Sequence, residues 1–402
     1  MVTPQGQAKP KRHCMVVHAY YPLGETRVER QALALIKHGY EVDVICLWAR
    51  KGPEVETRDG VNIYRLPVKR NKKGEAKSQF FEYLTFFVLA SLKVARLHRQ
   101  RRYGVVQVHN LPDFLVFSGL LPKLMGAKLI LDIHDLMPEF YAARFNNPNW
   151  SSWPMRLIRW QEWLSCRFAD RVITVTKSWQ ESLIQRGVPA KKVHVVMNVA
   201  DDQIFQRLPE TAPAHPNGGV RLIYHGNLTQ RYGIDLLIRA VDLARRQAPD
   251  LSLMIHGGGD YREELVKLAD ELKLHDYIQF TTTFVPSAEL PNLIRQAHVG
   301  VVPYRRDVFT DGILPTKLME YTALGLPTIV ARTPAVEAYF DDSMVEYFTA
   351  ENVEDLAASI LKLYHQPTRR AELAQKADAF NQRYNWAKLS VEYVDLINSL
   401  QG

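Results

Sequence analysis

The sequence has little cysteine and no long uncharged apolar run. Its 402 residues include three cysteines, Cys14, Cys46 and Cys166, which are far apart and odd in number. This argues against a disulfide framework and for a reducing compartment, and their spacing fits no zinc site. The longest uncharged apolar window, residues 83–92, has ten residues. A membrane-spanning helix needs about 20, so none is expected.

Several functional signatures are missing as well. Residues 1–12 are polar and basic, so we expect a disordered tail there and no secretory signal. The first strand–helix turn, residues 18–25, has no G-x-G, which disfavours an NAD-dependent dehydrogenase. Because His, Asp and Glu do not recur at ligand spacing, we expect no metal site and no cofactor.

Charge is unevenly distributed along the chain. Residues 1–210 hold 32 Lys+Arg and 19 Asp+Glu, a balance of +13, and the remainder carries −5. A basic half joined to an acidic half indicates two domains with different partners. The basic half suits anionic lipid, a phosphorylated substrate or nucleic acid. A nucleic-acid-binding protein therefore stays open as an alternative, although the sequence has no recognisable RNA or DNA module.

Apolar runs rich in β-branched residues alternate with stretches of helical length. We expect strands at residues 16–17, 42–47, 105–108, 129–133, 172–175, 193–197, 222–224, 251–255, 278–280, 299–302 and 328–330. Residues 26–38 have the length of a helix and are closed by Gly39. Near-continuous apolar strands that alternate with helices predict α/β architecture with parallel, doubly wound sheets.

A proline- and glycine-rich stretch interrupts this alternation at residues 208–219 and is interpreted as a linker. It separates an N-terminal Rossmann-like domain, 13–207, from a C-terminal one, 220–383. Residues 384–402 are expected to form an amphipathic helix that crosses back to the first domain. Ligands in open parallel sheets lie beyond the carboxyl ends of the strands, so we expect a cleft between the domains lined by strand-end loops.

The segment 311–331 is the strongest local signal. A loop ends at Pro315 and a helix starts near Thr316, where free backbone N–H groups favour a phosphate. Lys317 lies in this first turn, where a positive side chain interacts unfavourably with the helix dipole. A cation at this position is better explained if an anion binds beside it. Glu320 shares roughly the same face and suits two ribose hydroxyls. A solvated Lys–Glu pair on an ordinary helix is the competing interpretation.

The same segment, KLMEYTALGLPTIVA, resembles the nucleotide-binding signature of family-4 glycosyltransferases, which have the GT-B fold. The resemblance implies that Glu320 binds the donor ribose. The family usually has a second glutamate eight residues earlier, at the position of Gly312. Here Asp311 is its neighbour and is taken as a donor contact.

Two further segments of the C-terminal half fit this family. Residues 225–240 resemble its first strand, loop and helix, in which an Arg and a Lys usually bind the diphosphate. Asn227 and Tyr232 occupy those positions here, so Arg231 is expected to substitute and, with Lys317, to act in catalysis. The nucleotide site is completed by glycines of two loops, Gly226, Gly257 and Gly258.

In the N-terminal half, residues 129–139 carry a buried strand that ends in His134. The family has a histidine there that meets the donor sugar, so His134 is expected to be catalytic. The acceptor side is expected to comprise Tyr21, Gly24, Arg27, His109 and Asp135.

The resemblance implies a retaining, metal-independent transferase that uses a UDP- or GDP-sugar and acts in the cytoplasm. A nucleotide-sugar 2-epimerase of the same architecture is the main alternative. The basic cluster at residues 69–77 precedes an apolar helix at 80–97, and four tryptophans near 150–163 alternate with arginines. These features suit an anionic membrane surface and a lipid-linked acceptor, although both helices could simply pack on the sheet.

Overall fold

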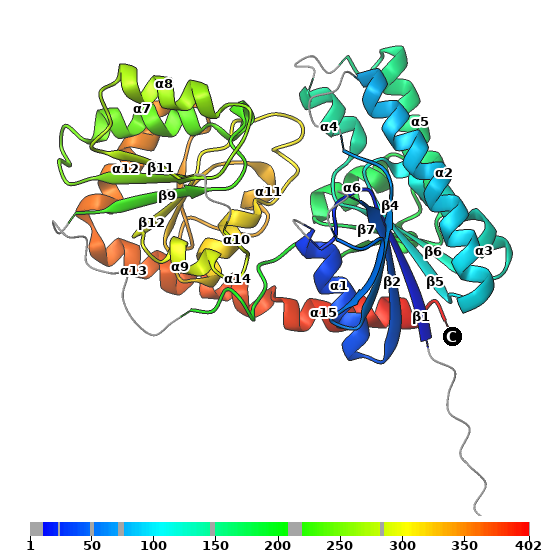
Figure 1. Ribbon diagram of the computed structural model, residues 1–402. Coiled ribbons are helices and arrows are strands. Elements are labelled where there is room, and N and C mark those ends of the chain that lie inside the picture. The colour runs from blue at the N-terminus through cyan, green and yellow to red at the C-terminus, as the bar shows by residue number, and fades with distance from the viewer. Residues whose placement is uncertain are drawn as a thin grey trace, which may run out of the picture. The chain divides into compact units, whose positions relative to one another are not determined.

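The computed structural model describes residues 11–22, 25–48, 52–70, 76–144, 149–207, 219–281 and 285–401. The chain forms two compact units (Figure 1). The first comprises residues 1–197 and 389–402, and the second comprises residues 198–388. Each unit has one largely parallel sheet with helices on both faces, as the sequence predicts.

The first unit has an eight-stranded sheet in the order β3-β4-β2-β1-β5-β6-β7-β8. Its strands are β1 (Lys11–Val17), β2 (Tyr40–Leu47), β3 (Val55–Arg58), β4 (Val61–Leu66), β5 (Val105–His109), β6 (Lys128–Ile133), β7 (Arg171–Thr174) and β8 (Val193–Val195). Its helices are α1 (Thr26–Lys37), α2 (Ala76–Arg101), η1 (Asp113–Gly119), α3 (Leu120–Leu124), α4 (Met137–Arg144), α5 (Trp153–Phe168), α6 (Lys177–Gln185) and η2 (Ala190–Lys192). In Figure 1, α1 lies on one side of the sheet, and α2, α3 and α5 lie on the other.

The second unit has a six-stranded sheet in the order β11-β10-β9-β12-β13-β14. Its strands are β9 (Arg221–His225), β10 (Ser252–His256), β11 (Ile278–Thr281), β12 (Val299–Val302), β13 (Thr328–Ala331) and β14 (Glu346–Phe348). Its helices are η3 (Gln230–Tyr232), α7 (Ile234–Ala244), α8 (Arg262–Glu271), α9 (Leu290–Ile294), α10 (Thr316–Ala323), α11 (Pro334–Glu337), α12 (Val353–His365), α13 (Pro367–Lys376) and α14 (Asp378–Arg383). Its core joins β9 and β10 to α7 and α12.

Two expectations about the first unit were wrong. The tail expected at residues 1–12 ends earlier, because β1 begins at Lys11, and Arg12 forms an ion pair with Glu41 at 2.8 Å. The sheet also contains an antiparallel pair, β3 with β4, that was not expected. Asp59-Gly60 between these strands has positive φ at both residues, which matches the Asp-Gly turn of a tight hairpin.

The last helix, α15 (Trp386–Asn398), lies within the expected range 384–402 and ends four residues earlier than expected. Residues 389–402 belong to the first unit, as the expected return of this helix requires. Its Leu389, Tyr393 and Ile397 are buried at helical spacing, so this face of the helix completes the core of that unit. Most of the expected linker, residues 208–218, lies outside the described residues.

Candidate active site

The second unit places Glu320 opposite the end of a central strand. Glu320 lies on α10, and its Oε2 is 2.6 Å from Nε2 of His225, the last residue of β9. The other ring nitrogen of His225 lies 2.9 Å from the Tyr321 hydroxyl. If that hydroxyl donates to Nδ1, then Nε2–H donates to the carboxylate. His225 thus holds the Glu320 side chain, which is only partly exposed.

Lys317, three residues before Glu320, is buried among aromatic rings. Its Nζ lies 4.8 Å from the ring centre of Tyr224, 5.0 Å from that of Tyr232 and 4.7 Å from that of Tyr304. It also donates a 2.7 Å hydrogen bond to the Tyr304 hydroxyl. We call these three tyrosines the tyrosine cage. Burial lowers the pKa of Lys317 to about 7, although the charge of Glu320 acts in the opposite direction.

Two glycine-containing loops lie beside this lysine. A Cβ on Gly257 would come within 1.9 Å of the Gly226 carbonyl oxygen, and one on Gly226 would lie 3.5 Å from Cε of Lys317. Gly257 therefore lets the loops after β9 and β10 pack backbone to backbone, which corrects the simpler idea that the glycines serve a ligand alone. At Gly258, by contrast, an added Cβ would meet open space.

The other residues expected to bind nucleotide are more exposed. Thr316 begins α10 and Asn227 follows β9, and both side chains are exposed. Arg231 lies in η3, and its guanidinium carbon is 5.3 Å from the Phe309 ring centre. Asp311 forms an ion pair with Arg306 at 2.7 Å, so its carboxylate already has a cationic partner.

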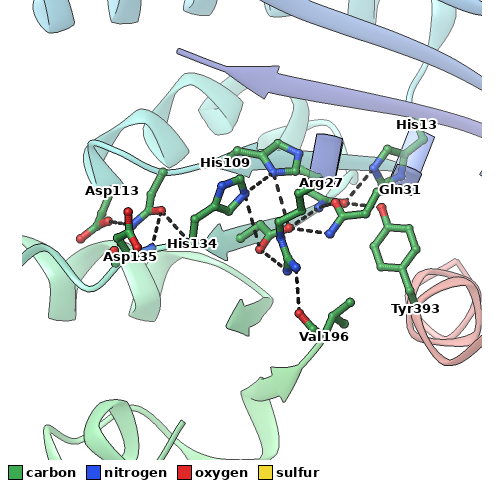
Figure 2. Close-up of polar contacts among 12 residues, drawn as sticks. His13, Arg27, Gln31, His109, Asp113, His134, Asp135, Val196 and Tyr393 are labelled. Carbon is green, nitrogen blue, oxygen red and sulfur yellow. Dashed lines mark hydrogen bonds and ion pairs between the residues drawn. The ribbon is translucent and has the colours of Figure 1, made fainter. Parts of the chain in front are cut away.

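In the first unit, His134 is half of a histidine pair at the ends of two adjacent strands. Figure 2 shows the pair within a network of polar side chains. His109 Nδ1 lies 3.0 Å from His134 Nε2, and also 3.4 Å from a carboxylate oxygen of Asp132. Burial lowers the pKa of His109 to about 3 and that of His134 to about 4. Both imidazoles are therefore neutral at pH 7.

Asp132 is the centre of that network. It is fully buried, and it accepts hydrogen bonds from Arg27 at 2.9 Å, Gln31 at 2.9 Å and Gln107 at 3.0 Å. Burial opposes ionisation, yet the net effect of Arg27 and its other neighbours is to lower the pKa of Asp132. Tyr393 of α15 donates to Gln107 at 2.7 Å, so the C-terminal helix is tied to the same network.

The residues expected on the acceptor side are not equally available. Arg27 and His109 are buried, and Arg27 bonds both Asp132 and the Val196 carbonyl oxygen. This corrects their assignment, because they support His134 instead of presenting a free surface to an acceptor. Tyr21 is also buried, Asp135 is partly exposed, and Gly24 lies outside the described residues.

His109, Asp132 and His134 also form the kind of group that can hold a metal ion, since their ligand atoms lie within 4.8 Å of one another. Arg27 is bonded to the same carboxylate. The positive charge of Arg27 at this distance would repel a metal ion, so these three residues fit a metal poorly. Sequence spacing missed the group because its members come from two neighbouring strands.

Asp132, Gln31 and Gln107 were missed, as was His225. Asp132 could have been found from the sequence. It lies in β6, two residues before His134, which directly follows the strand, and side chains at that spacing share one face. The tyrosine cage had no local signal, because Tyr224, Tyr232 and Tyr304 come from β9, η3 and the loop after β12.

Three helices of the first unit carry exposed apolar side chains. On α2, Phe86, Ala90 and Val94 are buried, whereas the outer side chains are exposed. Both α2 and α5 pack on η1, through Phe87 against Phe114 and Phe168 against Phe117. We define the apolar face as the exposed residues Phe80, Phe81, Leu84, Val88, Leu92, Leu120, Leu124, Trp153, Leu157 and Trp160. In the described part of the chain, no helix is long and apolar enough to span a membrane.

The second unit also has a hollow of about 360 Å³, which lies away from Lys317 and Glu320. It is lined by Arg221, Ser252 and Ile278, the first residues of three parallel strands. It therefore opens at the amino ends of β9, β10 and β11, whereas ligands of open parallel sheets bind at the carboxyl ends. We do not assign the donor to it.

Two protein-family models match the chain. Residues 24–198 match the glycosyl transferase 4-like domain, and residues 210–380 match glycosyl transferases group 1. One curated relative is the GDP-mannose-dependent alpha-(1-6)-phosphatidylinositol monomannoside mannosyltransferase of Mycolicibacterium smegmatis. It is 32% identical over 152 residues, which are 36% of this chain and 39% of that protein. The putative colanic acid biosynthesis glycosyl transferase WcaI of Escherichia coli is 26% identical over 360 residues, 85% of this chain and 84% of the relative.

Solved structures resemble the whole chain. Sucrose-phosphate synthase of Thermosynechococcus elongatus has a TM-score of 0.77 at 18% identity, with 97% of this chain and 99% of that chain covered. HepE of Anabaena in complex with UDP-glucose has a TM-score of 0.72 at 14% identity, with 96% and 99% covered. At these identities the likeness shows the fold alone.

Proposed function

Because this chain belongs to the family-4 glycosyltransferases, we propose that it transfers the sugar of a UDP- or GDP-sugar to an amphiphilic acceptor at a membrane surface. The two family models together span most of the chain, and both describe transferases. The chain is thus an enzyme that moves a sugar from a nucleotide-sugar donor to an acceptor, with the GT-B fold. The epimerase alternative is set aside. The family generally transfers with retention of anomeric configuration.

The observation that carries the donor assignment is that Lys317 and Glu320 lie three residues apart on α10. Both side chains lie by the end of β9, and in the described residues no carboxylate lies within ion-pair distance of the Lys317 amine. A diphosphate supplies the missing anion, and a carboxylate held by His225 suits the ribose hydroxyls. Arg231 is the second cation proposed to face the diphosphate, with Thr316, Asn227, Gly226 and Gly258 around it.

We propose that departure of the nucleotide needs no metal ion. The negative charge that develops on the leaving diphosphate is stabilised by Lys317, by Arg231 and by the free N–H groups at the start of α10. Cations fixed by the fold need no reorganisation when the bond breaks, so they can replace a divalent ion in this role. The same reasoning leaves the enzyme without a resident cofactor.

His134 is proposed to face the donor sugar as a neutral hydrogen-bond donor. Because Asp132 is anionic, Nδ1 of His109 should carry a proton. This N–H can donate to the Asp132 carboxylate and also to Nε2 of His134. The reverse arrangement would put a proton on Nε2 of His109, which is buried without a partner in the described residues. Nε2 of His134 is then an acceptor and Nδ1 carries the proton. Arg27, Gln31 and Asp132 act through His109 as positioning residues.

The amphiphilic acceptor is supported by the apolar face. This face consists of exposed aromatic and aliphatic side chains on α2, α3 and α5. Helix α5 also carries two exposed arginines, Arg156 and Arg159. Indole rings and basic residues together favour the surface of an anionic membrane. In the basic cluster at residues 69–77, residues 71–75 lie outside the described residues, whereas Lys69 and Arg70 are exposed. We place the enzyme at the cytoplasmic face of such a membrane.

Two relatives agree with this proposal in their names. The Mycolicibacterium smegmatis protein is a GDP-mannose-dependent mannosyltransferase for a phosphatidylinositol mannoside, and the Escherichia coli protein is assigned to colanic acid biosynthesis. We propose a role of this kind, in polysaccharide or glycolipid synthesis, with no nucleic acid partner.

The proposal is tested by a thermal-shift panel of UDP-, GDP-, ADP- and dTDP-sugars, followed by donor hydrolysis with any that bind. A saturating ligand raises the midpoint of unfolding, because it binds the folded state alone. We expect a clear shift with a UDP- or GDP-sugar and release of the nucleotide in EDTA. No shift with any of the four classes would contradict the donor assignment.

A further inference from the structure

Lys317 is enclosed in a way that makes its protonation state depend on what is bound. Its side chain is 5% exposed, and three aromatic rings surround the Nζ within 5.0 Å. Within the part of the chain that the structure describes, its one hydrogen bond is donated to the neutral Tyr304 hydroxyl. Rings and a hydroxyl attract a cation, but they replace water only in part.

The titratable groups that face this amine come from four elements. Tyr224 belongs to β9, Tyr232 to η3, Tyr304 to the loop after β12, and Glu320 to α10 itself. Burial raises the pKa of Tyr224 and Tyr304, so both phenols stay neutral near pH 7. Glu320 is the one carboxylate among them, and it is bonded to His225. The amine therefore has little anionic support before a ligand binds.

We propose that binding of the nucleotide diphosphate draws a proton from solvent onto Lys317, and that Tyr224, Tyr232 and Tyr304 are positioning residues that keep this amine desolvated until then. The inference rests on the proposed function, since it takes the diphosphate to bind beside Lys317. The balance is simple: one proton leaves the buffer, the neutral amine becomes an ammonium, and no covalent bond of the ligand changes.

The direction of the pH dependence follows from this exchange. The pKa of Lys317 is about 7 without ligand, and an adjacent diphosphate raises it, because an opposite charge favours the ammonium. Nucleotide affinity is therefore greatest below pH 7. As the pH rises from 7 towards the pKa of the complex, affinity falls, approaching roughly tenfold per pH unit. Above that higher pKa it becomes constant again.

Isothermal titration calorimetry in buffers of different ionisation enthalpy measures the proton directly. UDP, GDP, ADP and dTDP are titrated into the full chain at pH 7.0 and 8.5. With a pKa of about 7, the amine is about half protonated at pH 7.0. We therefore expect Lys317 to take up about 0.5 proton at pH 7.0 and nearly one at pH 8.5.

Two variants isolate the lysine from the ligand's own phosphate, which can also exchange a proton. Lys317→Arg keeps a permanent charge that does not titrate, so its proton uptake should fall by the lysine's share and its affinity should vary less with pH. Tyr304→Phe removes the oxygen that accepts from the ammonium, so uptake at pH 7.0 should rise. Tyr347→Phe is the matched control, because that hydroxyl is bonded to the Phe340 carbonyl oxygen elsewhere in the unit. It should behave as wild type.

The outcomes distinguish a failure of the proton-uptake inference from a failure of the proposed nucleotide site. Equal proton uptake by wild type and Lys317→Arg, with nucleotide bound to both, overturns the inference and leaves the donor site intact. If arginine does not fit, unchanged uptake in Tyr304→Phe overturns it equally. Failure of all four nucleotides to bind, or unaltered affinity in Lys317→Met, removes the donor assignment itself and the inference with it.

Discussion

His225 Nε2 lies 2.6 Å from Glu320 Oε2, so the last residue of β9 fixes a carboxylate on α10 beside the buried Lys317. This relationship joins two segments almost a hundred residues apart in the sequence. It gives the carboxylate one orientation before any ligand arrives, which reduces the ordering cost of binding.

The first prediction concerns that carboxylate. If Glu320 binds the ribose, Glu320→Ala should weaken nucleotide binding by about 1.5–3 kcal/mol, roughly 10- to 150-fold, because a charge-assisted hydrogen bond is lost. Calorimetry with UDP and GDP measures it, and circular dichroism should show an intact fold. Glu337→Ala is a suitable control, since that carboxylate pairs with Arg332 on the surface. An unchanged dissociation constant for the nucleotide would refute the assignment.

The second prediction concerns Arg231. It is proposed to stabilise charge that develops on the leaving diphosphate, so Arg231→Ala should lower kcat more than it weakens donor binding. Steady-state donor hydrolysis at saturating sugar nucleotide measures the split. Arg239→Ala, on the exposed side of α7, is the control and should leave both constants unchanged. Wild-type turnover in Arg231→Ala would remove this residue from the mechanism.

The sequence predicted most of the fold because its parallel strands are buried on both faces and therefore form continuous apolar runs. It missed the β3–β4 hairpin, whose exposed strand Val55–Arg58 has only one apolar residue. Spacing also predicted that Lys317 and Glu320 share a face of α10. It could not predict the tyrosine cage or the His225 contact, because those depend on the packing of separate elements. Arg27 and His109 were identified as site residues, but burial gives them a supporting role.

The third prediction concerns metal ions. Activity should survive EDTA, because the cations that stabilise the diphosphate belong to the protein. Donor hydrolysis is measured before and after dialysis against the chelator, with Mg²⁺ or Mn²⁺ added back. Complete loss of activity that either ion restores would mean that a metal site takes part, and the group of His109, Asp132 and His134 would then be the first to examine.

The fourth prediction concerns the tautomer of His134. Nitrogen NMR of the imidazoles at pH 7 should show both His109 and His134 neutral and protonated at Nδ1, since burial lowers the pKa of both well below 7. Asp132→Asn, which removes the anionic acceptor beside His109, should shift the tautomer balance and lower kcat. A protonated Nε2 on His134 in the wild type would contradict the proposed arrangement.

The fifth prediction concerns the apolar face. The chain should sediment with vesicles of phosphatidylcholine and phosphatidylglycerol, and less so at high salt. Each basic residue near such a surface contributes about 1 kcal/mol, so reversing Lys69, Arg70, Arg156 and Arg159 should abolish sedimentation. Lys72 and Lys73, in the same basic cluster, lie outside the described residues. Serine at Phe81, Leu84, Val88 and Leu92 should weaken it too.

Val391→Ser, at an exposed apolar residue of α15, is the control for those serine variants. Nucleotide binding, which depends on the second unit, should survive every change. A wild-type chain that does not sediment, or sedimentation that neither salt nor the reversals alter, would move the acceptor towards soluble molecules without affecting the transferase assignment.

The central claim is tested most directly by proton NMR of donor turnover. Wild-type enzyme and Glu320→Ala are each incubated with UDP-α-glucose and GDP-α-mannose in EDTA, and the anomeric signals are followed from the first minutes. We expect the wild type to release free nucleotide and, first, the α-anomer of the sugar, and Glu320→Ala to do so far more slowly. Conversion of one sugar nucleotide into another without free nucleotide, or equal rates for both proteins, would contradict the account.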